Sequence, residues 1–295
     1  MKAMVLAAGF GTRLRPYTLA RPKPLFPVLD RPLLLRILAQ LREAGATSIV
    51  VNAHHLREQI TALLADEPGV TVQLEKIELG TGGGLRLARR HFGEEPFLTV
   101  NGDIVHDIDL RAVFARHRDS RASVTMVLHD CPRFNNVLVS SDGRIIGFGD
   151  KARDDERLLA FTGIQVIEPA VLEAMPEGVF WNIIDCWRDL LARGGRIQAM
   201  VVSGHYWTDM GTPADYLALH QAILKEGRMT AWLDGQPQPI QISKTARLDA
   251  GAACEDWAVI GAGARIGAGS LLSRTVVWDN AEVPPHSVLA DTIVA

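Results

Sequence analysis

Short apolar segments alternate with helical patterns through most of the chain, and this alternation limits the folds that the chain can adopt. Strands are predicted at 3–7, 48–52, 70–74 and 97–100, and helices are predicted between them. The first helix is expected to have its N-cap at Asp30, Pro32 in its first turn and Gly45 after its end. Strand and helix in regular alternation indicate an α/β fold with a mainly parallel sheet and helices on both faces.

Later segments extend this pattern into a Rossmann-like sheet. Further strands are predicted at 123–128, 136–139, 144–148, 161–166 and 197–202, and further helices at 182–191 and 213–225. In open parallel sheets, ligands bind beyond the carboxyl ends of the strands. The glycine-rich loop after the first strand and the turn Asn101-Gly102-Asp103 both fall at such ends.

The C-terminal part of the chain has a different pattern. Residues 227–241 are rich in Gly, Gln and Pro and are expected to link a catalytic domain at 1–226 to a tail at 242–295. In the tail, an apolar residue recurs every six residues: Ile242, Leu248, Cys254, Ile260, Ile266, Leu272 and, at the next step, Trp278. This period predicts a short left-handed β-helix built from hexapeptide repeats.

Composition excludes several classes of protein. The chain has 295 residues, a net charge of −3 and 22% charged residues, which argues against a nucleic-acid-binding surface. The apolar run at the N-terminus is too short for a signal peptide, and no stretch is long enough to span a membrane, so a cytoplasmic protein is expected. Three widely separated cysteines, with no CxxC pair, make a structural zinc site unexpected.

The loop after the first strand carries the most informative motif, Leu6-Ala7-Ala8-Gly9-Phe10-Gly11-Thr12-Arg13-Leu14-Arg15-Pro16, followed by Thr18 and Lys23-Pro24. Backbone N–H groups in a glycine turn can converge on phosphate oxygens, and glycine lets the backbone approach without a Cβ clash. Arg13 offers a planar fork to phosphate, and Lys23 a point charge. The loop is neither a Walker loop nor a G-x-G-x-x-G turn.

This motif resembles the signature of the sugar-1-phosphate nucleotidyltransferase family, G-x-G-T-R-L-x-P-x-T followed by K-P. The chain most resembles the branch of mannose-1-phosphate guanylyltransferases, heptose-phosphate guanylyltransferases and N-acetylmuramate-1-phosphate uridylyltransferases, over roughly residues 1–225. The resemblance implies that Arg13 acts on the pyrophosphate leaving group and that Lys23 binds the reacting phosphates. It implies nucleotide contacts from Leu6, Ala8, Gly9, Gly11, Thr12 and Arg13.

A second glycine-rich run, Leu79-Gly80-Thr81-Gly82-Gly83-Gly84-Leu85, opens a predicted helix. Glycine is unfavourable there, so something must require a bare backbone, and a stacked nucleobase is one candidate. The resemblance implies that Gly80, Thr81 and Gly82 bind the nucleotide and that Glu75 reads the base edge. A carboxylate suits guanine, but similar uridylyltransferases also carry a nearby Glu, so GTP and UTP both stay open. The alternative for Glu75 is a solvated charge at a strand end.

Two aspartates that are distant in sequence resemble the metal ligands of the family. Asp103 ends Asn101-Gly102-Asp103, and Asp209 lies in Trp207-Thr208-Asp209-Met210-Gly211-Thr212-Pro213. The resemblance implies that these two carboxylates hold Mg²⁺, the usual partner of NTP phosphates. An isolated Asp after a strand is more often a turn or cap residue, and Asp107 and Asp109 are expected to belong to the cap of the next helix.

The sugar side is implied by resemblance alone. Asp150 and Lys151 correspond to a Glu-Lys pair of the family, and Thr162 and Gly163 to its Thr-Gly strand. Asn135-Asn136-Val137 stands where Tyr-Gly-Val is more usual. The implied reaction is in-line attack of a sugar phosphate on the α-phosphorus of an NTP.

Two alternative functions stay open beside the sugar nucleotidyltransferase. The rivals are a non-catalytic regulatory protein that binds an NDP-sugar and a phosphocholine cytidylyltransferase. The C-terminal repeats could join copies of the chain into a homo-oligomer, and no nucleic acid or membrane partner is expected. The base, the sugar phosphate and the pathway stay open.

Overall fold

A computed structural model of the chain describes residues 1–149, 151–153, 155–233 and 238–295. These residues form two compact units, each assembled from separate stretches of the chain. Unit 1 contains Met1–Phe10, Ile37–Ile104 and Ile108–Trp207, and unit 2 contains Gly11–Arg36, Val105–Asp107 and Thr208–Ala295. The expected domain boundaries at residues 226 and 241 stay predictions.

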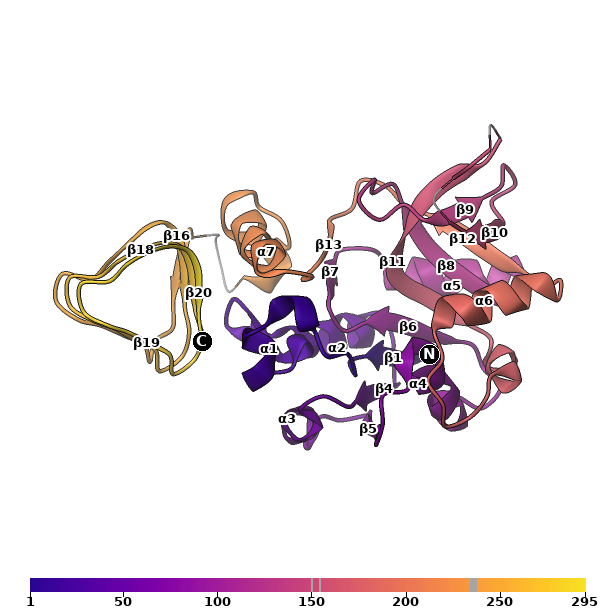
Figure 1. Ribbon diagram of the computed structural model, residues 1–295, viewed down its shortest axis with the longest axis horizontal. Coiled ribbons are helices and arrows are strands. Elements are labelled where there is room, and N and C mark those ends of the chain that lie inside the picture. The colour runs from indigo at the N-terminus through magenta and orange to yellow at the C-terminus, as the bar shows by residue number, and fades with distance from the viewer. Residues whose placement is uncertain (150, 154, 234–237) are drawn as a thin grey trace. The chain divides into compact units, whose positions relative to one another are not determined.

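Unit 1 is built on a nine-stranded sheet whose central strands are parallel. β1 (Lys2–Leu6) lies between β6 (Phe97–Asn101) and β4 (Ser48–Ala53), and β5 (Val70–Leu74) follows β4; all three pairings are parallel (Figure 1). This confirms the expected α/β fold with parallel strands at its centre.

The sheet continues beyond β6 through one long antiparallel strand, β11 (Arg157–Ile167). β11 pairs antiparallel with β8 (Val124–His129) and β9 (Val137–Val139). β10 (Ile145–Phe148) extends the sheet beyond β9, and β12 (Ile197–Val201) pairs in parallel with β8. The strands predicted between residues 123 and 202 are therefore present.

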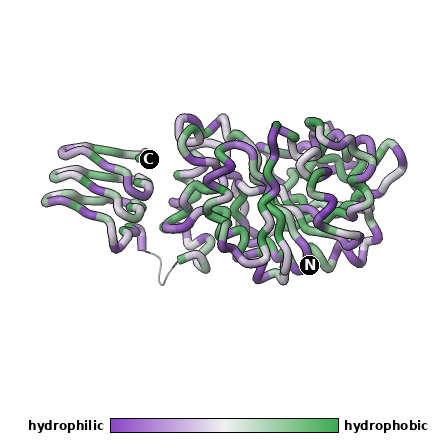
Figure 2. The backbone as a smooth tube through the Cα atoms, turned by 90° about the horizontal axis from the view of Figure 1, so that it is seen from below, coloured by the Kyte–Doolittle hydropathy of each residue, from purple (hydrophilic) through white to green (hydrophobic). Residues whose placement is uncertain are grey.

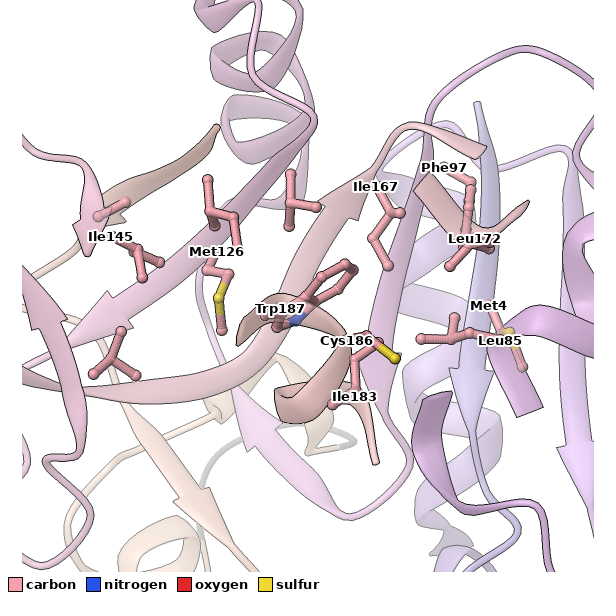
Figure 3. Close-up of a cluster of buried hydrophobic side chains, with 14 of the residues drawn as sticks. Met4, Leu85, Phe97, Met126, Ile145, Ile167, Leu172, Ile183, Cys186 and Trp187 are labelled. Atoms are coloured by element: carbon pink, nitrogen blue, oxygen red, sulfur yellow. The ribbon is translucent and has the colours of Figure 1, made fainter. Parts of the chain in front are cut away.

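Helices cover both faces of this sheet. On one face, α4 (Gly80–Ala88) and α6 (Ile183–Ala192) bury an apolar cluster in which Trp187 lies among Met126, Cys186 and Ile183 (Figure 3). On the other face, α5 (Leu110–Ser120) places His117 against Thr125, with 2.9 Å between Nδ1 and Oγ1. Successive side chains of a strand point to opposite faces, so Thr125 and Met126 face different layers. The remaining helices of this part of the chain are α2 (Leu33–Glu43) and α3 (Arg57–Leu64).

The start of α2 differs from the prediction. α2 begins at Leu33, and the preceding residues Arg31–Pro32 form a short strand, β3, that pairs with β2 (Pro27–Val28). Asp30 is therefore not the N-cap of the helix. Its carboxylate instead pairs with the guanidinium of Arg36 at 2.9 Å. The hairpin takes up the residues that local sequence rules assign to the first helical turn.

Unit 2 combines the N-terminal loop region with the C-terminal part of the chain. It holds α1 (Tyr17–Ala20) and α7 (Pro213–Lys225), and most of β7 (Ile104–His106) and β13 (Trp207–Asp209), which pair with each other. Within the part of the chain that the structure describes, no helix has both the length and the apolar character of a membrane span.

The C-terminal coil stack, residues 240–294, consists of two parallel sheets. One contains β14 (Ile240–Ile242), β16 (Ala253–Ile260), β18 (Leu271–Val277) and β20 (Val288–Val294), and the other β15 (Arg247–Leu248), β17 (Arg265–Ile266) and β19 (Glu282–Val283). Figure 1 shows the coils nested on one another, and Figure 2 shows hydrophobic and hydrophilic stretches alternating along them.

The register of the coil stack follows the six-residue period and then departs from it. Ile242 pairs with Ile260 and Cys254 with Leu272, as three six-residue steps per coil require. The register then shifts between Glu255 and Ala258, so that Ile260 pairs with Val277. Val277, and not Trp278, joins the apolar core of the stack. The prediction of Trp278 as the next step is wrong, because the bulge makes the next coil one residue shorter.

Candidate functional site

In unit 1, the turn that carries Asp103 closes on the end of β1. Leu6 pairs in register with Asn101, and the Gly102 N–H donates to the Leu6 carbonyl at 2.8 Å. A Cβ on Gly102 would lie only 2.8 Å from that oxygen, so glycine is required for this approach. The partly buried Asp103 therefore follows a turn packed against the start of the glycine-rich motif.

The Thr162–Gly163 segment of β11 lies against the same turn. Gly163 has φ +84°, and a Cβ there would lie 2.9 Å from Asn101 Nδ2. The buried Thr162 hydroxyl donates to the Val127 carbonyl at 2.9 Å, and the Thr162 carbonyl accepts from Trp207 Nε1 at 2.7 Å. The hydroxyl and the carbonyl of Thr162 thus both have protein partners.

The other expected sugar-binding pair is described only in part. Lys151 is exposed. Asp150 lies outside the described residues.

The glycines of α4 are explained by close protein packing. The Gly82 N–H donates to the Trp181 carbonyl at 2.8 Å, and a Cβ on Gly83 would lie 2.5 Å from the Val179 carbonyl oxygen. A Cβ on Gly84 would lie 2.7 Å from Glu75 Oε1. Neighbouring chain segments therefore demand bare backbone at residues 82–84.

The start of α4 is arranged differently. Gly80, with φ +65°, is partly buried, and Thr81 is exposed while its Oγ1 accepts from the Ile183 N–H at 3.2 Å. Exposed surface in this glycine-rich run therefore lies at the first turn of the helix, not at its three buried glycines.

Glu75 is a buried carboxyl group and not a solvated charge. Its side chain is 1% exposed, and its Oε1 accepts from Asn52 Nδ2 at 2.7 Å. Burial raises the pKa of the Glu75 carboxyl, and the Asn52 hydrogen bond partly offsets that rise. The interpretation as a solvated strand-end charge is wrong, because the fold covers the end of β5; the role of Glu75 in reading the base stays a prediction.

Asn52 is a residue of this region that sequence reasoning missed. Its Oδ1 accepts from the Ala7 N–H at 2.7 Å, so one buried amide joins Glu75 to the loop that follows β1. The available signal was its place at the end of the strand predicted at 48–52, because ligands bind beyond the carboxyl ends of parallel strands.

In unit 2, Gly11, Thr18 and Lys23 pack tightly. Gly11 has φ +61°, and a Cβ there would lie 2.9 Å from Thr18 Cγ2 and 3.3 Å from Lys23 Cβ. The Thr18 hydroxyl donates to the Gly11 carbonyl at 3.1 Å. Lys23 begins the 3-10 turn Lys23–Leu25 and is largely buried, whereas Thr12 is exposed. The second glycine of the motif is therefore needed to bring Thr18 and Lys23 against the loop.

Arg13 and Asp209, far apart in sequence, form an ion pair in unit 2. Arg13 Nη2 lies 3.6 Å from Asp209 Oδ2, and their side chains are 58% and 16% exposed. A Cβ on Gly211 would lie 2.7 Å from Asp209 Oδ2 and 3.0 Å from Arg13 Nη1, so Gly211 leaves the space that the pair occupies. A pair this long, with an exposed arginine, contributes little to stability.

The predicted aspartates are divided between the two units. Asp103 belongs to unit 1 and Asp209 to unit 2. Asp109 caps α5, accepting from the N–H groups of Arg111 and Ala112 at 2.9 and 3.2 Å, as expected. Carboxylate oxygens are the protein ligands that Mg²⁺ prefers, so the chemistry of Asp103 and Asp209 fits that ion.

Comparisons with known proteins agree with the motifs. The family model described as "Nucleotidyl transferase" matches residues 2–226. The mannose-1-phosphate guanylyltransferase of Mycobacterium tuberculosis is 29% identical, over 97% of this chain and 82% of that protein. The UTP–glucose-1-phosphate uridylyltransferase of Synechocystis sp. is 27% identical, over 100% of this chain and 87% of that protein.

Solved structures show the same fold. A putative glucose-1-phosphate thymidylyltransferase from Bacillus anthracis superposes with a TM-score of 0.65 at 22% identity, covering 75% of this chain and 94% of that chain. HddC from Yersinia pseudotuberculosis superposes with a TM-score of 0.64 at 21% identity, covering 75% of this chain and 99% of that chain.

Proposed function

The chain belongs to the nucleotidyl transferase family, and we propose that it transfers a nucleoside monophosphate unit from GTP or UTP to a sugar 1-phosphate, forming an NDP-sugar and pyrophosphate. Relatives named as guanylyl- and uridylyltransferases of mannose and glucose 1-phosphate support this substrate class. The structure of HddC complexed with GMP-PN supports a guanine nucleotide among the candidates.

The observation that carries the proposal is the Arg13–Asp209 pair beside Gly211. It brings the arginine of the glycine loop together with an expected metal-binding carboxylate, although 195 residues lie between them in the chain. A guanidinium at this place can neutralise the charge that grows on the departing pyrophosphate. Lys23, packed against the same loop, would bind the reacting phosphates.

The proposed reaction needs no covalent enzyme intermediate. A sugar phosphate oxygen attacks the α-phosphorus in line with the leaving pyrophosphate, and positioning and charge neutralisation supply the catalysis. Asp103 and Asp209 would hold Mg²⁺, which when bound supplies positive charge at the phosphate oxygens. Asp103 follows a turn packed on the motif, and Asp209 is paired with Arg13.

The remaining site residues are proposed from the motifs. The triphosphate would lie along Leu6, Ala8, Gly9, Gly11 and Thr12, and the space at Gly9 is open, since no atom lies within 4 Å of a Cβ built there. Gly80 and Thr81 would meet the base at the first turn of α4. Lys151 and the Thr162–Gly163 segment would face the sugar phosphate.

We further propose that the C-terminal coil stack is a left-handed β-helix that contributes to a homo-oligomer. Its first coil leaves Ile242 and Leu248 exposed, at 46% and 37%, although their register partners are buried. An uncovered apolar coil end of this kind could stack on a second copy. Ile242→Glu should lower the molar mass measured by light scattering if this end forms the interface; an unchanged mass would exclude that interface.

The decisive experiment follows pyrophosphate release from each of the four NTPs with a panel of sugar 1-phosphates and Mg²⁺. Arg13→Ala should lower kcat by about a hundredfold while retaining binding, because its interaction grows in the transition state. Arg265→Ala is the matched control, since Arg265 is 64% exposed and lies 3.9 Å from Glu282 in the coil stack. If the wild type releases no pyrophosphate with any pair, the proposal is wrong.

A further inference from the structure

Within unit 2, the C-terminal coil stack contacts residues 17–26, the segment that follows the glycine loop. Asp279 accepts two hydrogen bonds from Arg21, Nη1 to Oδ1 at 2.7 Å and Nη2 to Oδ2 at 3.0 Å. The Ile293 carbonyl accepts from the Tyr17 hydroxyl at 3.3 Å. A bidentate guanidinium–carboxylate pair fixes direction as well as distance, so these contacts hold Tyr17 and Arg21 at two points.

Trp278 is the centre of this contact. Its ring is 3% exposed and meets Phe26 edge to face, with 4.6 Å between ring centroids and 66° between planes. The guanidinium carbon of Arg21 lies 4.7 Å from the centroid of the same ring, and the Tyr17 ring lies 5.9 Å away. Aromatic pairs of this geometry and cations over indole faces are attractive.

The Trp278 indole is also hydrogen-bonded to α7. Trp278 Nε1 donates to the Tyr216 hydroxyl at 3.1 Å, and the Tyr216 hydroxyl donates to the Pro27 carbonyl. Tyr216 is fully buried, and its ring packs against Phe26 as well. The hydrogen-bond chain therefore runs from the coil stack through α7 to the residue that directly follows Phe26.

The one-residue shift in the coils allows this arrangement. The six-residue period would place Trp278 in the core of the coil stack. Val277 takes that position instead, so Trp278 lies outside this core. Its large apolar ring is buried against Phe26 instead. The departure from the repeat thus coincides with the contact surface.

The segment of residues 17–26 carries residues of the proposed reaction. It contains Thr18, whose hydroxyl donates to the Gly11 carbonyl, and Lys23. The Phe26 N–H donates to the Lys23 carbonyl at 3.0 Å, so the ring held by Trp278 belongs to the turn that begins at Lys23. Lys23 therefore lies between two anchored residues, Arg21 and Phe26.

We propose that Trp278 and Asp279 are positioning residues, through which the C-terminal coil stack holds Lys23 and the glycine loop in place for NTP. This inference rests on the proposed function for its effect on the reaction, but the contact itself can be tested without substrates. Misplacement of a phosphate-binding group by about an ångström can lower a rate substantially, so a loosened segment should weaken both binding and turnover.

The test compares two aspartates of the coil stack, each in a bidentate pair with an arginine. Asp279→Asn weakens the pair with Arg21, whereas Asp291→Asn weakens the pair of Arg274, with bonds of 2.6 and 2.7 Å, inside the coil stack itself. Asp279→Asn should raise the KM for NTP and lower kcat, reducing kcat/KM by about five- to tenfold, a small part of what positioning contributes. Asp291→Asn should stay within about twofold of the wild type, as expected for an exposed pair.

A charge exchange and a substrate-free measurement complete the experiment. Arg21→Asp combined with Asp279→Arg should recover most of the lost kcat/KM, which a general loss of stability would not allow. Hydrogen exchange of a peptide covering residues 17–26, measured on the full chain without substrates, should become faster in Asp279→Asn and not in Asp291→Asn. Trp278→Phe, which keeps an aromatic ring but removes the donor to Tyr216, should show the same two changes.

The outcomes separate the two proposals. Without pyrophosphate release from the wild type, the proposed function fails, and the hydrogen-exchange comparison still decides the contact. If the wild type is active and Asp279→Asn matches Asp291→Asn in both kcat/KM and exchange, the proposal that the coil stack holds residues 17–26 in place is wrong. Faster exchange with unchanged kcat/KM would overturn the positioning role and leave a purely structural contact.

Discussion

Asn52 should be among the most sensitive polar residues of unit 1. Its buried amide makes two hydrogen bonds of 2.7 Å, one from the Ala7 N–H and one to the Glu75 carboxyl. Asn52→Ala leaves a buried N–H without that acceptor, at about 1–3 kcal/mol, and removes a hydrogen bond to a carboxyl group whose raised pKa favours its neutral form, worth about 0.5–1.5 kcal/mol. The two losses share one residue and need not add, so the free energy of unfolding should fall by about 3 kcal/mol.

The chain offers a matched control at the surface. Asn135 makes the same two bonds, accepting from the Cys131 N–H at 2.9 Å and donating to Asp130 Oδ1 at 2.8 Å, but in a partly exposed loop. Water can replace both partners there, so Asn135→Ala should cost less than about 1 kcal/mol. The assay is urea unfolding followed by intrinsic tryptophan fluorescence, with wild type and both variants at one pH.

The free energy of unfolding should also depend on pH through Glu75, the partner of Asn52. Burial raises the pKa of the Glu75 carboxyl, so the folded state holds its proton at a pH where the unfolded chain has released it. Stability from this group is therefore present below the ordinary Glu pKa and is lost as pH rises through the raised value. Asn52→Asp places a second carboxyl beside the first and raises the pair's pKa further, which should steepen the loss.

Unfolding measured at pH 5, 7 and 8.5 checks this reasoning. Asn52→Asp should be closest to wild type at pH 5 and weakest at pH 8.5, and adding Glu75→Gln should remove most of that slope. An Asn52→Ala variant no less stable than Asn135→Ala would refute the reasoning. So would an Asn52→Asp variant equally destabilised at every pH.

Three further predictions concern the proposed site. Asp103→Asn and Asp209→Asn should each lower kcat by at least about a hundredfold at saturating Mg²⁺, and near-wild-type turnover in both would remove them as metal ligands. Gly211→Ala should lower kcat, because its Cβ would lie 2.7 Å from Asp209 Oδ2; unchanged pyrophosphate release would show that the Arg13–Asp209 arrangement is not used. Gly9→Ala should leave the melting temperature of the free protein unchanged, since the Cβ position is open, but should raise the KM for NTP through contact with the phosphates; a changed melting temperature with an unchanged KM would contradict both parts.

Much of the fold follows from local rules that operate within a few residues. The helix predicted at 213–225 is α7 with the same bounds, and the predicted strands agree with the observed ones within a few residues at their ends. Asp109 caps its helix as its position before an apolar pattern predicts. The glycine loop is equally readable, because its residue types and spacing are contiguous in the chain. In each case the sequence alone determined the result, since periodicity, capping and turn chemistry involve near neighbours.

What the sequence could not decide involves partners far away in the chain. Glu75 is buried because the amide of Asn52 and the bare backbone of Gly84 meet it, and Gly211 matters because of Arg13. Trp278 leaves the six-residue repeat because a bulge between Glu255 and Ala258 moves the register by one residue. Burial and strand register are set by how distant segments pack, and a shift of one residue redirects a side chain entirely. Only the tertiary structure could therefore show which residues surround the glycine-rich loop.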